Sequence, residues 1–353
     1  MTEKIRVAVI GARGIGKHHA KWHHISGAEV VAFVGTSEET CGQTEGILRG
    51  LFDFRGKGYW DMDEMLRSEH PDVVDVCSPA TVHKTHVLKA LEYGTHVLCE
   101  KPLVWDEEKS AEEMLADGRE MVAAAQDRGR MLGICTQYAA IRPCYEEIYR
   151  EHRGTLGRIE RFSFTIESKG KAGRKGRAIW VDLGSHPIGA LLAWIPEGVV
   201  DAERVEGALS ADRVVAQFDV LAGSGDRSAV QIVTANAPKG SPPRRHIGLN
   251  GFVVDVEGKA DEQGIFRTVL HHEGAERWSE DLMHTTIRRF LEAVQEDDEA
   301  RICATGAVGL RNLELQIEML EALEKLHPQF GEWGLGRAEG GRNNPKSEIR
   351  NPK

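Results

Sequence analysis

A short apolar strand that runs into a glycine-rich turn near the N-terminus constrains the fold of this chain most strongly. Ile5–Ile10 is apolar apart from Arg6, and Gly11, Gly14 and Gly16 follow it where a helical pattern begins. Glycine is needed where a chain turns tightly and where a phosphate approaches the backbone, and N–H groups at a helix N-terminus bind that phosphate. The order of strand, glycine loop and helix therefore predicts a dinucleotide-binding unit.

The first half of the chain alternates β-branched runs with helical patterns. We expect strands at Ile5–Ile10, Glu29–Val34, Val73–Cys77, His96–Cys99 and Met131–Thr136, with helices at Gly14–Ile25, Asp61–Ser68, Thr81–Tyr93 and Glu107–Arg128. Strands this apolar are typical of a parallel sheet covered by helices on both faces. Residues 1–137 are therefore predicted to form a doubly wound, α/β Rossmann domain.

The second half shows longer strands that alternate apolar and polar residues. We expect strands at Arg158–Glu167, Val214–Leu221, Ala229–Ala235, His246–Glu257 and Gly264–Leu270, with helices at Asp182–Trp194, Leu282–Gln295 and Thr305–Leu326. This pattern predicts an α+β domain with a large, mostly antiparallel open sheet over residues 138–330, which would bind substrate and form oligomers. Residues 331–353 lack core-forming side chains, so we expect a disordered tail.

Charge and hydropathy exclude several classes of protein. The net charge of −10 over 353 residues argues against binding to nucleic acid, which needs clustered positive charge. No apolar run approaches the ~20 residues that cross a bilayer, and no signal peptide precedes the first strand, so we expect a cytoplasmic protein without a membrane partner. The six cysteines form no C-x-x-C pair and are interpreted as reduced thiols rather than disulfides or metal ligands.

The end of the second strand bears on the choice of cofactor. NAD is usually held by an acidic residue at this position, but here the strand ends in Gly35, Thr36 and Ser37. These small residues leave room for a 2′-phosphate, and Arg13 supplies a counter-charge, which favours NADP. The alternative is NAD, with Glu38 reaching back to the ribose. The cofactor-binding residues expected from these two segments are Gly11, Arg13, Gly14, Ile15, Gly16, Gly35, Thr36 and Ser37.

Two further segments resemble a known family. The run Cys77–His83, containing Ser78 and Pro79, and the run Gly94–Leu103, with its Glu-Lys-Pro motif, resemble the Gfo/Idh/MocA oxidoreductases, such as inositol and glucose dehydrogenases and glucose–fructose oxidoreductase. The resemblance covers residues 5 to about 195, with a weaker match at Gly154–Ile159. It implies hydride transfer with a nicotinamide cofactor, near which Ser78, Pro79, His83, Glu100 and Lys101 would lie.

The catalytic candidates are Lys101, Asp182 and His186. Lys101 follows a buried-type strand, at the end where α/β sheets place ligands, and a cation there can polarise a substrate hydroxyl. Asp182–His186 resembles the D-x-G-x-H motif of the family, and residues four apart share a helix face. By resemblance, His186 takes the hydroxyl proton and Asp182 orients the substrate or the imidazole. The family commonly has a second Asp where this chain has Gly189.

Three weaker features complete the candidate site. Tyr138 and Trp180 are interpreted either as sugar-stacking residues or as core. Arg174 lies in the basic, glycine-rich segment 169–177, which we interpret as a loop that closes over an anionic substrate such as a uronate or a sugar phosphate. The four histidines at positions 18, 19, 23 and 24 are interpreted as an exposed helix face, and no metal site is predicted.

These residues favour an NAD(P)-dependent dehydrogenase or reductase acting on the hydroxyl carbon of a sugar, a cyclitol or a related compound, anionic ones included. Two alternatives stay open. One is a glycoside hydrolase or lyase that oxidises its substrate transiently with bound NAD, and the other is a cofactor-sensing protein without catalysis. By analogy with the family, the long strands of the second domain would pair between subunits in a homodimer or homotetramer.

Overall fold

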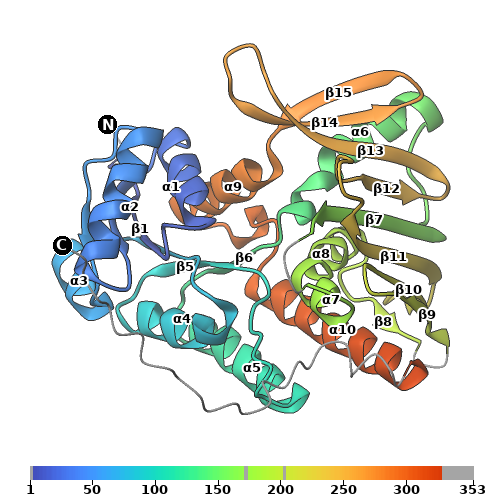
Figure 1. The fold of residues 1–353 in the computed structure, drawn as a ribbon, viewed down its shortest axis with the longest axis horizontal. Coiled ribbons are helices and arrows are strands. Elements are labelled where there is room, and N and C mark those ends of the chain that lie inside the picture. Colours follow the sequence, from blue (N-terminus) through green and yellow to red (C-terminus); the bar gives the residue numbers. More distant parts are fainter. Residues whose placement is uncertain (1–2, 171–173, 202–203, 328–353) are drawn as a thin grey trace, which may run out of the picture.

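The computed structural model describes residues 3–170, 174–201 and 204–327, which form two sheets with helices around and between them (Figure 1). The first sheet has six parallel strands, and the second has nine strands that are mostly antiparallel. The predicted α/β plus α+β fold is therefore confirmed. The expected tail 331–353 lies outside the described residues.

The first sheet has the strand order β3-β2-β1-β4-β5-β6. Its strands are β1 (Arg6–Ile10), β2 (Glu29–Val34), β3 (Lys57–Tyr59), β4 (Val73–Val76), β5 (His96–Glu100) and β6 (Leu132–Cys135), and its helices are α1 (Gly16–Ile25), α2 (Glu38–Leu51), α3 (Met62–Glu69), α4 (His83–Glu92) and α5 (Ala111–Asp127). The chain order reverses between β1 and β4, and ligands of doubly wound folds bind outside the carboxyl ends of the strands at such a point.

The second sheet has the order β15-β14-β13-β12-β7-β11-β10-β8, with β9 paired to β10. Its strands are β7 (Arg161–Lys169), β8 (Val199–Val200), β9 (Glu206–Leu209), β10 (Arg213–Leu221), β11 (Arg227–Ala237), β12 (Arg245–Leu249), β13 (Phe252–Ala260), β14 (Phe266–His272) and β15 (Ala275–Glu280). Along the strands of β10 and β13, buried apolar residues alternate with more exposed ones, because one face of the sheet packs on helices.

Helices of the second half connect the two sheets. They are α6 (Arg142–Arg153), α7 (Arg177–Leu183), α8 (Ser185–Trp194), α9 (Leu282–Glu296) and α10 (Gly306–Leu326). In Figure 1, α7, α8 and α10 lie between the sheets, and α9 lies beside α1. The carboxyl edge of the first sheet therefore faces α7 and α8. No helix in the ranges that the structure describes is long and apolar enough to cross a membrane.

Two elements that were predicted as continuous are each divided in the structure. The strand expected at His246–Glu257 is a hairpin of β12 and β13, because Asn250 and Gly251 both have positive φ (51° and 82°) and form a two-residue turn. The helix expected at Asp182–Trp194 begins earlier and is divided at Gly184 between α7 and α8.

Candidate active site

Two adjoining cavities lie at the carboxyl edge of the first sheet. The larger, of about 820 Å³, is lined by the glycine loop, the end of β2 and the start of α3, and we call it the loop cavity. The smaller, of about 520 Å³, contains Lys101 and His186, and we call it the Lys101 cavity. Both cavities are lined by Cys77, Ser78 and Pro79, so they meet at the segment that follows β4.

The glycine loop passes so close to β4 that only glycine fits. Gly11 has φ +84°, and a Cβ atom there would lie 2.8 Å from the carbonyl oxygen of Cys77. A Cβ atom at Gly16 would lie 2.6 Å from the carbonyl oxygen of Gly11. Residues 11–14 line the loop cavity just before the start of α1, which is where a helix N-terminus binds a phosphate in such folds.

The predicted cofactor residues are distributed over both cavities. Gly11, Arg13, Gly14, Gly35, Thr36, Ser78 and Pro79 line the loop cavity, and Ile15, Ser78, Pro79, Glu100 and Lys101 line the Lys101 cavity. Three others contribute indirectly. Ser37 caps α2 through the N–H of Thr40, and Gly16 begins α1. The ring nitrogens of the buried His83 lie 2.8 Å and 3.0 Å from the carbonyl oxygens of Ser78 and Pro102, so His83 positions both cavity-lining segments.

The loop cavity also contains groups that the sequence analysis missed. Trp60, 56% exposed, lines the cavity together with Thr40, Asp61, His86 and Lys89. Trp60 directly follows β3, and the carboxyl ends of parallel strands are where such sheets place ligands, but β3 was not among the predicted strands.

The three catalytic candidates lie together in the Lys101 cavity. The Lys101 ammonium donates a hydrogen bond to the backbone oxygen of Asp182 at 2.7 Å, and its Nζ lies 3.7 Å from Oδ1 of the same residue. His186 lies one turn further along, at the start of α8. The chain thus brings a cation, a carboxylate and an imidazole to the meeting point of the two cavities.

His186 is held as a neutral imidazole. Burial lowers the pKa of His186 well below 6.5, the positive charges of Lys101 and Arg245 lower it further, and Asp182 offsets part of this. Its Nδ1 has no hydrogen-bond partner among the residues that the structure describes. A neutral imidazole has a lone pair that can accept a proton at neutral pH. Arg245, at the start of β12, is a second group near the site that the sequence analysis did not identify.

Arg174 contacts the candidate site through Asp182. Its side chain is only 5% exposed, and its guanidinium forms an ion pair with Oδ2 of Asp182. It also donates to Oδ1 of Asn236 from Nε at 2.9 Å and to Oγ of Ser168 from Nη2 at 2.7 Å. Arg174 lines neither cavity, so in this structure it braces Asp182 rather than facing a substrate. Of the basic loop, residues 171–173 lie outside the described ranges.

The two aromatic candidates differ in their position. Tyr138 is buried and packs its ring edge-on to that of His186, with centroids 5.5 Å apart. Trp180 is fully buried, and its indole Nε1 donates to the carbonyl oxygen of Gln316 at 2.9 Å. The sugar-stacking interpretation of Trp180 is therefore corrected, because a ring enclosed by the core offers no face to a substrate.

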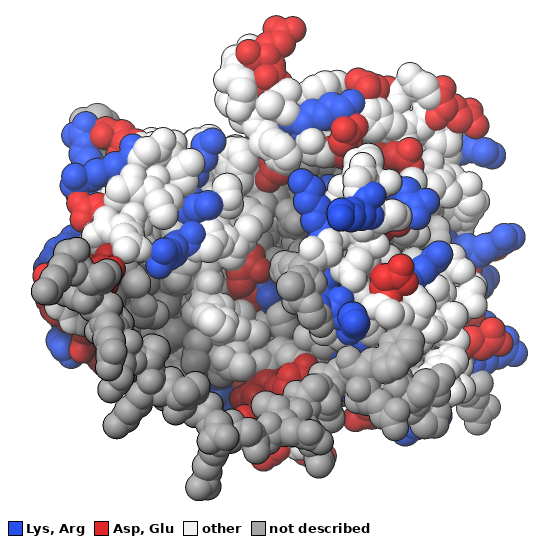
Figure 2. Space-filling model, viewed as in Figure 1, with Lys and Arg blue, Asp and Glu red and all other residues white. Residues whose placement is uncertain are grey.

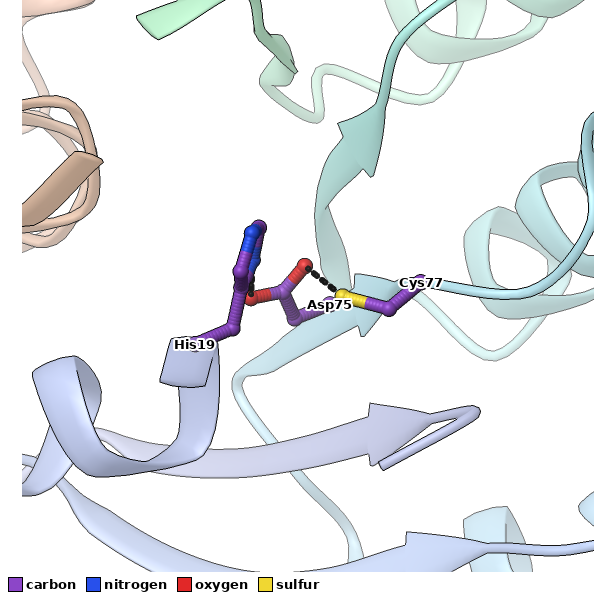
Figure 3. A group of neighbouring side chains, drawn as sticks. All are labelled: His19, Asp75 and Cys77. Carbon is purple, nitrogen blue, oxygen red and sulfur yellow. Dashed lines mark hydrogen bonds and ion pairs between the residues drawn. The ribbon is translucent and has the colours of Figure 1, made fainter. Parts of the chain in front are cut away.

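The interpretation of the four α1 histidines as an exposed helix face is wrong. His19 and His23 are fully buried, and both contact Asp75 on β4 through Oδ2, at 2.9 Å from His19 Nδ1 and 2.7 Å from His23 Nε2. Figure 3 shows His19 and Cys77 on either side of that carboxylate. Burial opposes a charge on His19, but neighbouring Cys77 and Asp75 outweigh it and raise the pKa of His19 well above its usual value.

A family model and several curated relatives are similar to the N-terminal part of the chain. Residues 5–135 match a sequence model of the Gfo/Idh/MocA group, described as an oxidoreductase family with an NAD-binding Rossmann fold. The D-glucoside 3-dehydrogenase of Escherichia coli is 33% identical over 130 residues, which is 36% of this chain and 33% of that protein. The D-apiose dehydrogenase of Paraburkholderia graminis is 31% identical over 196 residues, or 52% of this chain and 48% of that protein.

Solved structures resemble the whole fold. The UDP-N-acetylglucosamine 3-dehydrogenase of Acidithiobacillus ferrooxidans superposes with a TM-score of 0.69 at 18% identity, over 92% of this chain and 99% of its own. An inositol dehydrogenase homologue from Azotobacter vinelandii, solved with NADH and myo-inositol, superposes with a TM-score of 0.67 at 17% identity. The superposition covers 92% of this chain and 97% of that one.

The sequence matches to the curated relatives are shorter, about a third of the Escherichia coli protein, so they concern mainly the N-terminal domain. Three features of the chain agree with the family match: the strand, loop and helix at the N-terminus, the Ser-Pro and Glu-Lys-Pro segments, and the two-sheet architecture. Residues 5–135 therefore resemble the NAD-binding Rossmann domain of the Gfo/Idh/MocA oxidoreductases.

Proposed function

We propose that the protein is an NAD(P)-dependent dehydrogenase or reductase that transfers hydride between a nicotinamide and a hydroxyl carbon of a sugar or cyclitol. One observation carries the proposal: the loop cavity and the Lys101 cavity meet at Cys77–Pro79, with Lys101 and His186 in the second. A dinucleotide lying through both cavities would bring its nicotinamide to these two side chains. Relatives named as dehydrogenases of glucosides, apiose and inositol support the same substrate class.

The residues present fit a dinucleotide. The glycine loop is a backbone cradle that a Cβ atom at Gly11 would fill, and α1 begins directly behind it. When bound, the nicotinamide supplies the acceptor for the hydride. Lys101 polarises the substrate hydroxyl, His186 accepts its proton, and Asp182 holds the Lys101 ammonium through its backbone oxygen. Arg174 in turn fixes the carboxylate of Asp182.

We propose NADP rather than NAD as the preferred cofactor. The end of β2 provides no carboxylate to the loop cavity, where Thr36 and Thr40 lie at the start of α2. The positive end of a helix dipole favours a phosphate at this place, and Arg13 adds a positive charge beside it. We expect Thr36→Asp to weaken NADP binding at least tenfold and to leave NAD binding equal or stronger, with Thr44→Ala as a control variant in the same cavity.

The charges around the Lys101 cavity support an anionic substrate, as the basic loop suggested. Lys101 and Arg245 both act on His186. The two carboxylates that line this cavity are each paired, Asp182 with Arg174 and Glu100 with His19. Figure 2 shows Lys and Arg side chains over the second domain beside the hollow between the domains, with Asp and Glu side chains among them. We expect uronates or sugar phosphates to give a higher kcat/KM than neutral polyols, and Arg245→Gln to reduce that preference.

The test is binding of NADP(H) and NAD(H) to the purified chain, followed by nicotinamide absorbance with a panel of sugars, uronates and cyclitols. Lys101→Ala and His186→Ala should abolish turnover while retaining cofactor binding, and Lys259→Ala, on β13, should leave turnover unchanged. Tight binding with no net cofactor turnover would favour transient oxidation or a sensor, and absence of binding would reject the proposal.

We further propose that the chain assembles into a homodimer or homotetramer through the open face of its second sheet. Val253, Gln217 and Gln231 point away from the packed face of that sheet and form a mixed apolar and polar surface. All six cysteines are free thiols, which supports a reducing, cytoplasmic location. Light scattering should give a mass of two or four chains, and charged substitutions at Val253 and Gln231 should give one.

A further inference from the structure

A buried group of ligand-type side chains lies beneath the Lys101 cavity. His19 Nε2 lies 3.0 Å from Oε1 of Glu100 and 3.8 Å from Sγ of Cys135. The three residues come from α1, the end of β5 and the end of β6, and all of them are buried. The fold therefore brings together one nitrogen, one oxygen and one sulfur atom within 4.8 Å of one another.

We propose that His19, Glu100 and Cys135 form a zinc site. In tetrahedral zinc sites the metal lies about 2.0 Å from nitrogen and oxygen and about 2.3 Å from sulfur, so neighbouring ligand atoms lie about 3.3 Å (N to O) and 3.5 Å (N to S) apart. The observed 3.0 Å and 3.8 Å differ from these edges by about 0.3 Å each. Two of the three ligand-to-ligand distances are therefore close to those of a zinc site, and the third, from Glu100 to Cys135, is within 4.8 Å.

The surroundings of His19 are those of a metal-bound histidine. Its other nitrogen, Nδ1, lies 2.9 Å from Oδ2 of Asp75, and ligand histidines usually donate that second N–H to a carboxylate. Asp75 is itself fixed by Nε2 of His23 at 2.7 Å and by the thiol of Cys77 at 3.4 Å (Figure 3). This fixes the imidazole with Nε2 directed at Glu100 and Cys135.

Exchange of protons for the metal conserves the buried charge. Both nitrogens of His19 face carboxylate oxygens, so without a metal both carry a proton, and the Cys135 thiol carries one as well. The three side chains then sum to zero: +1 for His19, −1 for Glu100 and 0 for Cys135. Zinc displaces one proton from His19 and one from Cys135, and the total with the +2 ion is again zero. The ion therefore adds no net charge to the protein interior.

The site is accessible from one side. Glu100 and Cys135 line the Lys101 cavity, whereas His19 lies behind them without exposure. An ion can enter through that cavity, and its fourth position faces it, where a water molecule can bind. Three protein ligands and one open position are an established arrangement for zinc. Neither Lys101 nor His186 is a ligand, so zinc binding can be measured separately from the proposed hydride transfer.

A second set of donors, His19, Asp75 and Cys77, shares the same imidazole. It would use Nδ1 and would replace the hydrogen bond between His19 and Asp75, which orients the imidazole. The set with Glu100 and Cys135 keeps that contact, so we assign the ion to it. The two sets are distinguished by which cysteine provides the sulfur.

The test uses the full chain, freed of metal with a chelator and then loaded with Zn²⁺ or with Co²⁺ as a spectroscopic probe. We expect one ion per chain and, with Co²⁺, a thiolate charge-transfer band. Cys135→Ser should remove the band, whereas Cys77→Ser and the distant control Cys303→Ser should keep it. Asp75→Asn should keep the band but weaken the affinity about 10- to 100-fold, as expected for a group that orients a ligand.

X-ray absorption spectroscopy at the zinc edge of the unmodified, zinc-loaded chain tests the assigned ligands without any variant. We expect one sulfur and otherwise nitrogen or oxygen neighbours. Absence of stoichiometric binding, a first shell without sulfur, or a charge-transfer band that survives in Cys135→Ser would overturn the proposal.

Discussion

Replacing Arg174 with Met tests whether this arginine braces Asp182 or binds substrate. Methionine keeps most of the apolar length of the side chain and removes the guanidinium that pairs with Asp182, Asn236 and Ser168. Arg174 is almost fully enclosed, so Asp182 would be left as a partly buried carboxylate without this partner, 28% exposed and still near Lys101. The substitution should therefore lower both stability and kcat.

The magnitude follows from this burial. Removing one partner of a buried ion pair costs about 3–5 kcal/mol. Water reaches about a quarter of the Asp182 side chain, so we expect a smaller free-energy loss, about 2–3 kcal/mol, at or below the lower end of that range. For a domain of this size the melting temperature should fall by about 4–12 °C.

The matched control is Arg177→Met. Arg177 forms ion pairs with Glu107 and Glu324, whose side chains are 48% and 30% exposed, so we expect a loss of about 0–1 kcal/mol. Thermal and urea unfolding measure both variants side by side, and steady-state kinetics separate kcat from KM. If Arg174→Met matches Arg177→Met in stability and raises only KM, the bracing role is refuted and the substrate role is favoured.

Three more predictions follow from individual residues. Gly11→Ala should abolish dinucleotide binding in a calorimetric titration, whereas Gly27→Ala, with a similar φ of +89° but open space around it, should bind normally at a cost of about 1–2 kcal/mol. The pKa of His186 lies well below 6.5 in the folded chain, so the unfolded chain takes up a proton near pH 6.5 that the folded chain does not. Urea unfolding should therefore show that the wild type loses about 1.4 kcal/mol more stability than His186→Gln between pH 7.5 and pH 5.5. An equal loss of stability in both proteins would contradict this. Trp180→Ala should cost about 3–5 kcal/mol of stability, and a large change in KM with unchanged stability would restore the stacking role.

Local patterns predicted the elements of the first sheet because its strands are apolar throughout and its glycine loop has a direct backbone requirement. The same patterns missed α2, whose buried positions are Cys41, Thr44 and Leu48. Only one of these is a large aliphatic residue, so the helix shows no apolar stripe. Its N-terminus could have been found from Ser37, which caps the helix and forms a capping box with Thr40.

The histidines of α1 show where spacing ceases to be informative. A separation of four residues places His19 and His23 on one helix face, but it does not say what that face meets. Their partner Asp75 lies 56 residues beyond His19, and Glu100 lies 81 residues beyond it. Only the parallel order of β1, β4 and β5 brings these carboxylates against α1. The exposed-face interpretation failed because polar residues were assumed to face water, whereas here they satisfy one another in the interior.

The substitution of glycine for the expected second aspartate on α8 has a packing cause. A Cβ atom at Gly189 would lie 2.2 Å from Oγ1 of Thr136, which itself donates to the carbonyl oxygen of Ser185. The start of α8 therefore lies directly on the segment that follows β6, and a carboxylate has no room there. Substrate contacts that an aspartate would make must come from other walls of the Lys101 cavity, where Gln137 and Met283 lie. A wall with an amide and a thioether in place of a carboxylate does not repel a negative charge, so the proposed anionic substrate meets no repulsion from this wall.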